Sequence, residues 1–244
     1  MTAPVVLLHG IESSRSTFWR VERDLADLGV VVTSLDLPGH GSRPAPPPGS
    51  RTLHGLAAAV APEVPAGALV VGHSLGTLVA LTLAAAGAPV AGLLLEEPPS
   101  LPPGVPPVEV AGDIAGDARR ARVDPDGELA RLLAAEPRWA RSDAEHAVAN
   151  HAAVDVEAAL ELMEGASWDI AALIRESPVP VALLAATPGG SALTEPDRAP
   201  VLEHLGSAAL VVESGHGVHR DRPGVWTAAV LRMLDTLPIP TLRR

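Results

Sequence analysis

The sequence predicts an α/β fold, in which a doubly wound, mostly parallel sheet carries an inserted helical cap. Short β-branched or leucine-rich runs alternate with turns and helical patterns in the first and last parts of the chain. These runs are apolar on both faces, as strands are when helices cover both sides of a parallel sheet. Between residues 100 and 176 the alternation stops, and helical patterns continue without a convincing strand.

Six short runs are expected to form the strands. Each strand-helix-strand unit should make a right-handed crossover, and repetition of this unit gives a doubly wound sheet. A helical pattern at 76–86 follows the third run directly, and another at 223–234 lies near the end. The expected strands are residues 5–8, 30–35, 68–71, 91–95, 179–185 and 208–212.

The middle of the chain opens with "PPSLPPGVPP", a stiff and extended segment. Its clearest helix is "SDAEHAVANHAAVDVEAALELM", where Ser142 and Glu145 have capping-box spacing and apolar residues recur at helical intervals. A single crossover rarely needs so many residues. We therefore expect a core domain of residues 1–99 and 177–244 and a helical cap, or lid, of residues 100–176, with ordinary crossover helices as the alternative.

Composition and charge exclude several classes of protein. The chain of 244 residues is 47% hydrophobic, which suits one large domain with an insertion. A net charge of −11 without a Lys/Arg-rich run argues against nucleic acid and anionic membranes as partners. The absence of cysteine removes disulfides and thiolate chemistry. Because we find neither a long apolar span nor a positively charged leader, we expect a soluble, cytoplasmic protein.

The strongest chemical signal is "GHSLG", in which Ser74 is the central residue of a G-x-S-x-G pattern between a strand and a helix. A nucleophile on a sharp strand-to-helix turn needs small residues nearby, because larger side chains collide with neighbouring elements; Gly72 and Gly76 meet this need. Ser74 would then lie above the helix N-terminus, whose free N–H groups favour a developing negative charge. We predict that Ser74 is a nucleophile; the alternative is a surface serine in a glycine-rich turn.

A serine nucleophile needs a base that takes its proton. Most of the nine histidines lie in turn-like motifs or on helical patterns. His216 lies between Gly215 and Gly217, in the loop after a strand that ends at Val212, and α/β sheets place their chemistry at the carboxyl ends of strands. We predict His216 as the general base. His219, near a helix start, is the alternative, although pairing with local polar groups is the simpler role for it.

Taken in order, these motifs resemble those of the α/β-hydrolase superfamily. The similar segments are "VVLLHG" with "STFW", then "LDLPGHGSR", "GHSLG" and "GHGVHRDRP", and they span nearly the whole chain. The resemblance implies an oxyanion hole formed by the backbone N–H groups of Ile11, just after Gly10, and of Leu75. Both lie at strand-to-helix turns, where N–H groups have no helical partner. The resemblance also implies an α/β-hydrolase sheet trimmed at the N-terminus.

The same resemblance implies a carboxylate that orients the histidine, normally in the loop after the second-last strand. In "VALLAATPGGS", Thr187 stands about where that acid is expected. In "VAGLLLEEPPS", by contrast, the strand after the nucleophile helix ends in two glutamates. Zearalenone-lactone hydrolases and some haloalkane dehalogenases are similar in taking their acid from this strand. Strand alternation puts Glu97 at the equivalent position and Glu96 on the opposite face. We predict Glu97 as the acid, with Glu96 or the Glu195/Asp197 loop as alternatives.

The expected activity is that of a cofactor-independent serine hydrolase, which cleaves a carboxylic ester or lactone through a Ser-His-Glu triad and an acyl-enzyme. The acid placement favours an apolar lactone of aromatic or polyketide type. Trp139 and Trp168 could stack on such a small-molecule substrate, although core packing is the simpler role for each. A C–C bond hydrolase or a thioesterase would use the same triad, and a ligand receptor without turnover is the alternative outside enzymes. No metal site is expected, because the histidines lack H-E-x-x-H spacing.

Overall fold

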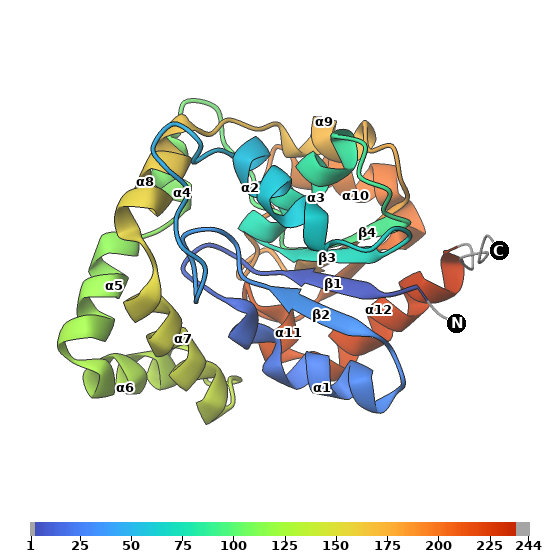
Figure 1. Cartoon of the computed structure of the whole chain (residues 1–244). Coiled ribbons are helices and arrows are strands. Elements are labelled where there is room, and N and C mark those ends of the chain that lie inside the picture. Colours follow the sequence, from blue (N-terminus) through green and yellow to red (C-terminus); the bar gives the residue numbers. More distant parts are fainter. Residues whose placement is uncertain (1–2, 238–244) are drawn as a thin grey trace.

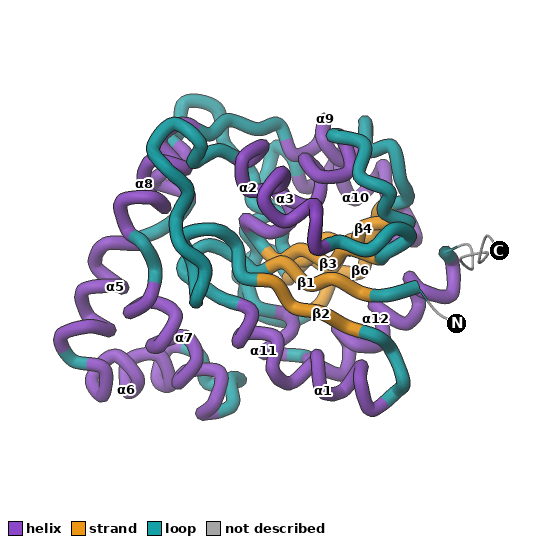
Figure 2. The backbone as a smooth tube through the Cα atoms, viewed as in Figure 1, coloured by secondary structure: helices purple, strands orange, loops and turns teal. Residues whose placement is uncertain are grey.

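The computed structural model describes residues 3–237, and its centre is a six-stranded sheet in which every pair of neighbouring strands is parallel. The strand order is β2-β1-β3-β4-β5-β6, so the chain starts inside the sheet, moves to one edge, and then crosses to build the other side. Figure 2 shows the strands between layers of helices. The strands are β1 (Val5–Leu8), β2 (Val32–Leu35), β3 (Leu69–His73), β4 (Gly92–Glu96), β5 (Val181–Ala186) and β6 (Ala209–Val212).

The doubly wound α/β class predicted from the sequence is confirmed, and each expected strand overlaps an observed one. Strand alternation divides the apolar residues between two cores. In β1, for example, Val6 and Leu8 belong to one buried cluster, whereas Val5 and Leu7 belong to the other. All four residues are buried, because helices cover both faces of the sheet.

Two layers of helices cover the sheet (Figure 1). The helices of one layer pack into the apolar core that contains Val6, and those of the other layer pack into the core that contains Val5. The first layer consists of α2 (Leu53–Val60), α3 (Leu75–Ala85), α9 (Ile170–Arg175) and α10 (Arg198–Leu205). The second consists of α1 (Trp19–Asp27), α11 (Val218–Asp221) and α12 (Pro223–Thr236). Short 3₁₀ turns lie at η1 (Arg15–Phe18), η2 (Ala61–Glu63) and η3 (Gly206–Ala208).

The chain between β4 and β5 is helical, and five of its helices extend past one end of the sheet in Figure 1. They have small apolar clusters of their own, one of which includes Leu132 and Val148. A second cluster, around Ile114 and Val154, packs against Ile11 of the core. The last two helices of this stretch pack into the main core, α8 through Leu162 and Met163 and α9 through Ile170 and Ile174. The five helices are α4 (Pro107–Val110), α5 (Ile114–Val123), α6 (Pro125–Ala135), α7 (Arg141–Ala153) and α8 (Val156–Gly165).

The capping box expected from Ser142 and Glu145 is wrong. The N-cap residue of helix α7 is Ala140, two residues before Ser142, and the carboxylate that reaches back belongs to Asp143, whose Oδ2 accepts the N–H of Ala140 at 2.9 Å. Glu145 instead pairs with Arg141, one turn away, at 2.8 Å. Two acids near one helix start compete for the same role, and the spacing rule alone selected the wrong one.

Across residues 3–237, no helix combines the length and the apolar character that crossing a bilayer requires.

Candidate active site

Ser74 lies on a strained turn between β3 and α3. Its backbone angles, φ 50° and ψ −117°, are sparsely populated for a residue with a side chain. A Cβ added at Gly76 would lie 2.1 Å from the carbonyl oxygen of Leu8, and one added at Gly72 would lie 2.4 Å from that of Gly76. Glycine is therefore required on both sides of Ser74, because the turn brings backbone against backbone.

The turn after β1 lies directly beside Ser74. An added Cβ at Gly10 would be 3.1 Å from Ser74 Cβ, which places the N–H of the next residue, Ile11, close to the serine. The N–H of Leu75 belongs to the first residue of α3, where no carbonyl of the helix can accept it. Both N–H groups therefore belong to turns that adjoin Ser74.

His9 fixes this turn to the next loop. Its Nδ1 donates to the carbonyl of Gly10 at 2.7 Å, and its Nε2 accepts the N–H of Leu37 at 2.9 Å. Burial lowers the pKa of His9 from 6.5 to about 3, so the ring is neutral, as a ring that both donates and accepts must be.

Glu97 directly follows β4, but its carboxylate lies at the end of β5. The side chain is fully buried, and the residue has a φ of 54°. Its Oε1 accepts the N–H of Ala186 at 2.5 Å and the hydroxyl of Ser191 at 2.9 Å, while its Oε2 accepts the N–H of Ala192 at 2.6 Å. Three hydrogen-bond donors thus hold the carboxylate beside the loop after β5. This loop contains Thr187, at the position where the family resemblance implies an acid.

His216 lies opposite this carboxylate. Its Nδ1 is 3.4 Å from Glu97 Oε2, and the imidazole side chain is 44% exposed. Among residues 3–237, Glu97 is the one acidic residue with an oxygen within 4.0 Å of the His216 ring. The His216 ring and the Glu97 carboxylate both lie at the carboxyl ends of strands. Ser74 directly follows the carboxyl end of β3, so all three residues lie at the same end of the parallel sheet.

The alternatives for base and acid pair with each other on the opposite side. Glu96 Oε1 accepts from Nδ1 of His219 at 2.8 Å, and both residues are buried. Glu195 accepts a long hydrogen bond from Ala199 at the start of α10, where Asp197 is the N-cap residue. Glu195 thus has the helix-start role that the sequence allowed, Asp197 makes no side-chain capping hydrogen bond, and Glu96 is buried.

The two tryptophans proposed as substrate contacts lie in different surroundings. Trp168 is 8% exposed within the main core, and its Nε1 donates to the carbonyl of Pro99 at 2.8 Å. Trp139 is half-buried in the helical insertion, with the guanidinium of Arg220 lying 4.2 Å from its ring centroid. Burial thus favours a packing role for Trp168, whereas Trp139 lies within reach of the segment that carries His216.

Glu12, which the sequence did not single out, is a further unusual residue at this edge. Among residues 3–237, the non-glycine residues with positive φ are Glu12, Ser74 and Glu97. Burial and then the nearby Asp117 raise the pKa of Glu12 to about 7. Such strain is costly and tends to collect at functional sites, so its confinement to these three positions supports the location of the site.

The residues that hold Glu97 were also missed. Arg198 Nη1 donates to Ser191 Oγ at 2.9 Å and its Nη2 donates to the carbonyl of Ala186 at 2.8 Å, which fixes the loop whose N–H groups bind Glu97. The sequence offered one signal for these residues, which is the absence of an acid at Thr187. A carboxylate that reaches this loop from another strand needs hydrogen-bond donors in the loop.

Comparison with known proteins identifies the family of the chain. A family model described as "Alpha/beta hydrolase family" matches residues 5–230. No curated protein matches the chain.

Solved structures share the fold at low sequence identity. An N-formylmaleamic acid deformylase from Pseudomonas putida is 24% identical with a TM-score of 0.76, over 95% of this chain and 92% of the other. An esterase from a Rhodococcus species is 23% identical with a TM-score of 0.70, over 97% and 92%. An N-acyl homoserine lactonase is 20% identical with a TM-score of 0.67, over 100% and 92%.

Proposed function

Because the chain belongs to the alpha/beta hydrolase family, we propose that it is a serine hydrolase that cleaves a carboxylic ester or lactone through Ser74, His216 and Glu97. The observation that carries the proposal is the 3.4 Å approach of His216 Nδ1 to the buried carboxylate of Glu97, at the sheet edge where Ser74 occupies a strained turn. The order of the three in the chain is nucleophile, acid, base, as in this family.

The hydrogen-bond partners assign a role to each nitrogen of His216. Glu97 can only accept, so His216 carries a proton on Nδ1, and Nε2 is left to take the proton of Ser74. Ser74 Oγ then attacks the carbonyl carbon, and His216 returns the proton to the leaving alcohol. The carboxylate of Glu97 stabilises the imidazolium that forms in between.

The negative charge that develops on the carbonyl oxygen needs N–H donors already in place. In this proposal the backbone N–H groups of Ile11 and Leu75 supply them. Gly10 supports this role, since its missing side chain lets the turn lie against Ser74. Water then attacks the acyl-enzyme with the same base, and Ser74 is restored.

We also propose that residues 100–176 act as a lid over the site and shape the substrate pocket, with residues 1–99 and 177–244 as the core domain. Helices α5, α6 and α7 support this division, because they share an apolar cluster of their own, and α5 meets the core near Ile11. We propose an apolar substrate, and a flat lactone of aromatic or polyketide type could lie along Trp139. Trp168 is assigned to packing.

A fluorophosphonate probe tests the proposal directly. The wild-type protein should be labelled once, Ser74→Ala should not be labelled, and Ser167→Ala, a change of an exposed serine, should react as the wild type does. Turnover should follow with short p-nitrophenyl esters or with a panel of lactones.

Other outcomes separate the alternatives. If the protein is labelled but turns over only thioesters or C–C substrates, the proposed triad stands and the bond that it cleaves is a different one. A wild-type protein that is not labelled would overturn both catalytic proposals and leave a ligand receptor.

A further inference from the structure

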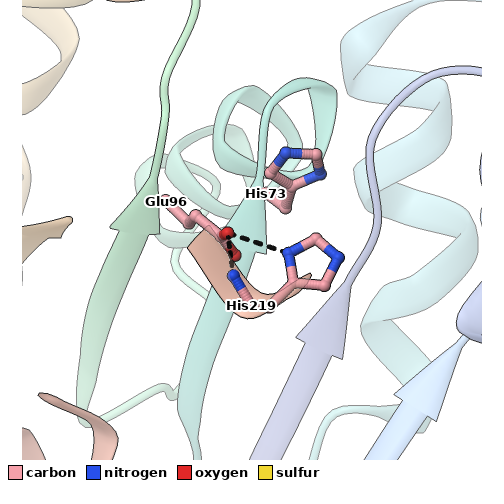
Figure 3. A group of neighbouring side chains, drawn as sticks. All are labelled: His73, Glu96 and His219. Atoms are coloured by element: carbon pink, nitrogen blue, oxygen red, sulfur yellow. Dashed lines mark hydrogen bonds and ion pairs between the residues drawn. The ribbon is translucent and has the colours of Figure 1, made fainter. Parts of the chain in front are cut away.

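The residue before each proposed catalytic residue on β3 and β4 points to the opposite face of the sheet. His73 precedes Ser74, and Glu96 precedes Glu97. Together with His219 they form the buried cluster in Figure 3, in which His73 is 7% exposed, Glu96 0% and His219 2%. This cluster lies under the site and takes no part in the mechanism proposed above.

Glu96 is fully used as an acceptor. Its Oε1 accepts from both the backbone N–H and Nδ1 of His219, each at 2.8 Å, and its Oε2 accepts from Nε1 of Trp226 at 2.8 Å. His219 therefore carries its proton on Nδ1, and its Nε2 accepts the hydroxyl proton of Thr17 at 2.9 Å. Burial keeps the pKa of His219 well below its usual range, which agrees with a neutral ring.

The network ends at a cation. The hydroxyl oxygen of Thr17 accepts from Nε and Nη2 of Arg220, at 3.0 and 2.6 Å. Although His73, Glu96 and His219 lie close enough together to be considered as metal ligands, N–H donors already occupy both oxygens of Glu96 and Thr17 occupies the free nitrogen of His219. The donors and acceptors therefore fit a hydrogen-bonded network rather than a metal site.

His73 packs against His219, with ring centroids 4.9 Å apart, and makes its hydrogen bond to the backbone of the proposed base. Its Nε2 lies 3.1 Å from the carbonyl oxygen of His216, and a carbonyl only accepts, so the proton of His73 is on Nε2. Its Nδ1 is buried without a hydrogen-bond partner and faces Gly10, where an added Cβ would be 3.0 Å away. The single ring N–H of His73 therefore donates to the backbone carbonyl of His216.

From these contacts we infer that His73 and Glu96 are positioning residues, which hold the loop that carries His216; this rests on the proposed function of His216. The loop is fixed at three points. Gly215 N–H donates to Asp221 Oδ2 at 2.6 Å, the carbonyl of His216 accepts from His73, and the N–H of His219 donates to Glu96.

The loop needs such support because little else restrains the ring. His216 lies between two glycines, its side chain is 44% exposed, and its contact with Glu97 is long at 3.4 Å. A catalytic group displaced by about 1 Å can cost about 100-fold in rate. Loss of an anchor should therefore lower kcat and leave KM nearly unchanged.

Two replacements of His73 differ in whether they can make this hydrogen bond. In His73→Gln the amide nitrogen falls near the position of Nε2, so it can still donate to the His216 carbonyl. In His73→Asn the amide stops near Nδ1 and falls short. His54→Gln is the matched control, because it makes the same change at an exposed histidine away from the loop.

The readouts are the rate constant for fluorophosphonate labelling and the values of kcat and KM on an ester. We expect His73→Asn and His73→Leu to lower the labelling rate and kcat by about 10- to 100-fold, with KM within about twofold. His73→Gln should recover most of this loss, and His54→Gln should keep the wild-type rate. Thermal unfolding of each variant shows which of them are folded, and the polar Asn variant provides the comparison if the Leu variant is not.

Two results would overturn the inference: wild-type rates in His73→Asn, or a His73→Gln variant as slow as His73→Asn. His216→Ala separates this failure from that of the proposed function. If His216→Ala keeps the wild-type rate, the proposed base is wrong. If it is inactive while His73→Asn is normal, only the anchoring role is lost.

Discussion

Glu97 Oε1 accepts the backbone N–H of Ala186 at 2.5 Å, so an acid carried by β4 reaches the end of β5. In the proposed triad, this contact lets Glu97 serve in the stead of an acid at Thr187. The carboxylate lies next to the position that the usual acid would occupy, and only the strand that delivers it has changed.

Replacement of Glu97 by glutamine should lower kcat/KM by about 10³- to 10⁴-fold, because the neutral amide neither orients His216 nor stabilises its charged form. The measurement is steady-state turnover of an ester, together with thermal unfolding. Asp197→Asn, at the start of α10, is the control and should keep the wild-type rate. If Glu97→Gln stays active while Glu96→Gln or Asp197→Asn fails in a folded state, the acid has been assigned wrongly.

Alanine at Gly76 should destabilise the protein by about 2–3 kcal/mol or more, because its Cβ would lie 2.1 Å from the carbonyl oxygen of Leu8. Gly224 offers a matched comparison inside α12, since nothing lies within 4 Å of an added Cβ there. Gly224→Ala should raise the stability by about 0.5–1 kcal/mol. Urea unfolding measures both changes, and equal effects would contradict the close packing of the turn.

The protein should lose stability as the pH falls below about 6.5. Burial lowers the pKa of His9 to about 3 and holds those of His73 and His219 well below 6.5. Each ring therefore favours the folded state fully above pH 6.5, and this contribution is lost as the pH falls towards the pKa in the folded protein. Each can add a slope of up to about 1.4 kcal/mol per pH unit.

Urea unfolding at several pH values between 7 and 5 measures this slope. His219→Gln should reduce the dependence of stability on pH by up to about 1.4 kcal/mol per pH unit, which is the contribution of one proton. The same change at the exposed His54 should leave this dependence unchanged. An unchanged slope in His219→Gln would mean that His219 is not kept neutral.

Glu12 should act in the opposite direction. Its pKa rises from 4.5 to about 7 in the folded protein, mainly through burial. The stability that it contributes is present below pH 4.5 and is lost as the pH rises through 7. Glu12→Gln should therefore be more stable than the wild type at pH 8.5, on the order of 1 kcal/mol because the group is partly exposed, and nearly equal to it at pH 4.5. Glu109→Gln, at an exposed position, is the control, and the midpoint of thermal unfolding is the measurement.

The two tryptophans should differ in what their loss changes. Trp168→Phe removes a buried hydrogen bond to Pro99 and should lower the stability by about 1–2 kcal/mol with little effect on KM. Trp139→Ala should raise KM for aromatic esters several-fold more than for acetate esters. If KM changes in the Trp168 variant and not in the Trp139 variant, Trp168 is the substrate contact and Trp139 is the packing residue. Turnover of paired aryl and acetate esters measures the effect.

Local patterns in the sequence were enough to predict the sheet and the turn at Ser74. Strands apolar on both faces identify a covered parallel sheet, and two glycines around a serine identify a turn with no room for side chains. Strand alternation also separated Glu97 from Glu96, because adjacent residues must point to opposite faces.

The rest depends on contacts between distant segments. Nothing near Glu96 in the chain indicates that it binds His219 and Trp226, and nothing near Ala186 indicates that its N–H binds Glu97. The start of α7 was mispredicted for a local reason, since both Asp143 and Glu145 lie near enough to cap it. Geometry selected Asp143, and the spacing rule did not.

The pairing of roles on β4 restricts how this site can change in evolution or in design. Glu97 and Glu96 are neighbours with opposite duties, so a shift of one residue in the register of the strand would exchange the acid with the anchor of the His216 loop. A single insertion in β4 would therefore damage both at once.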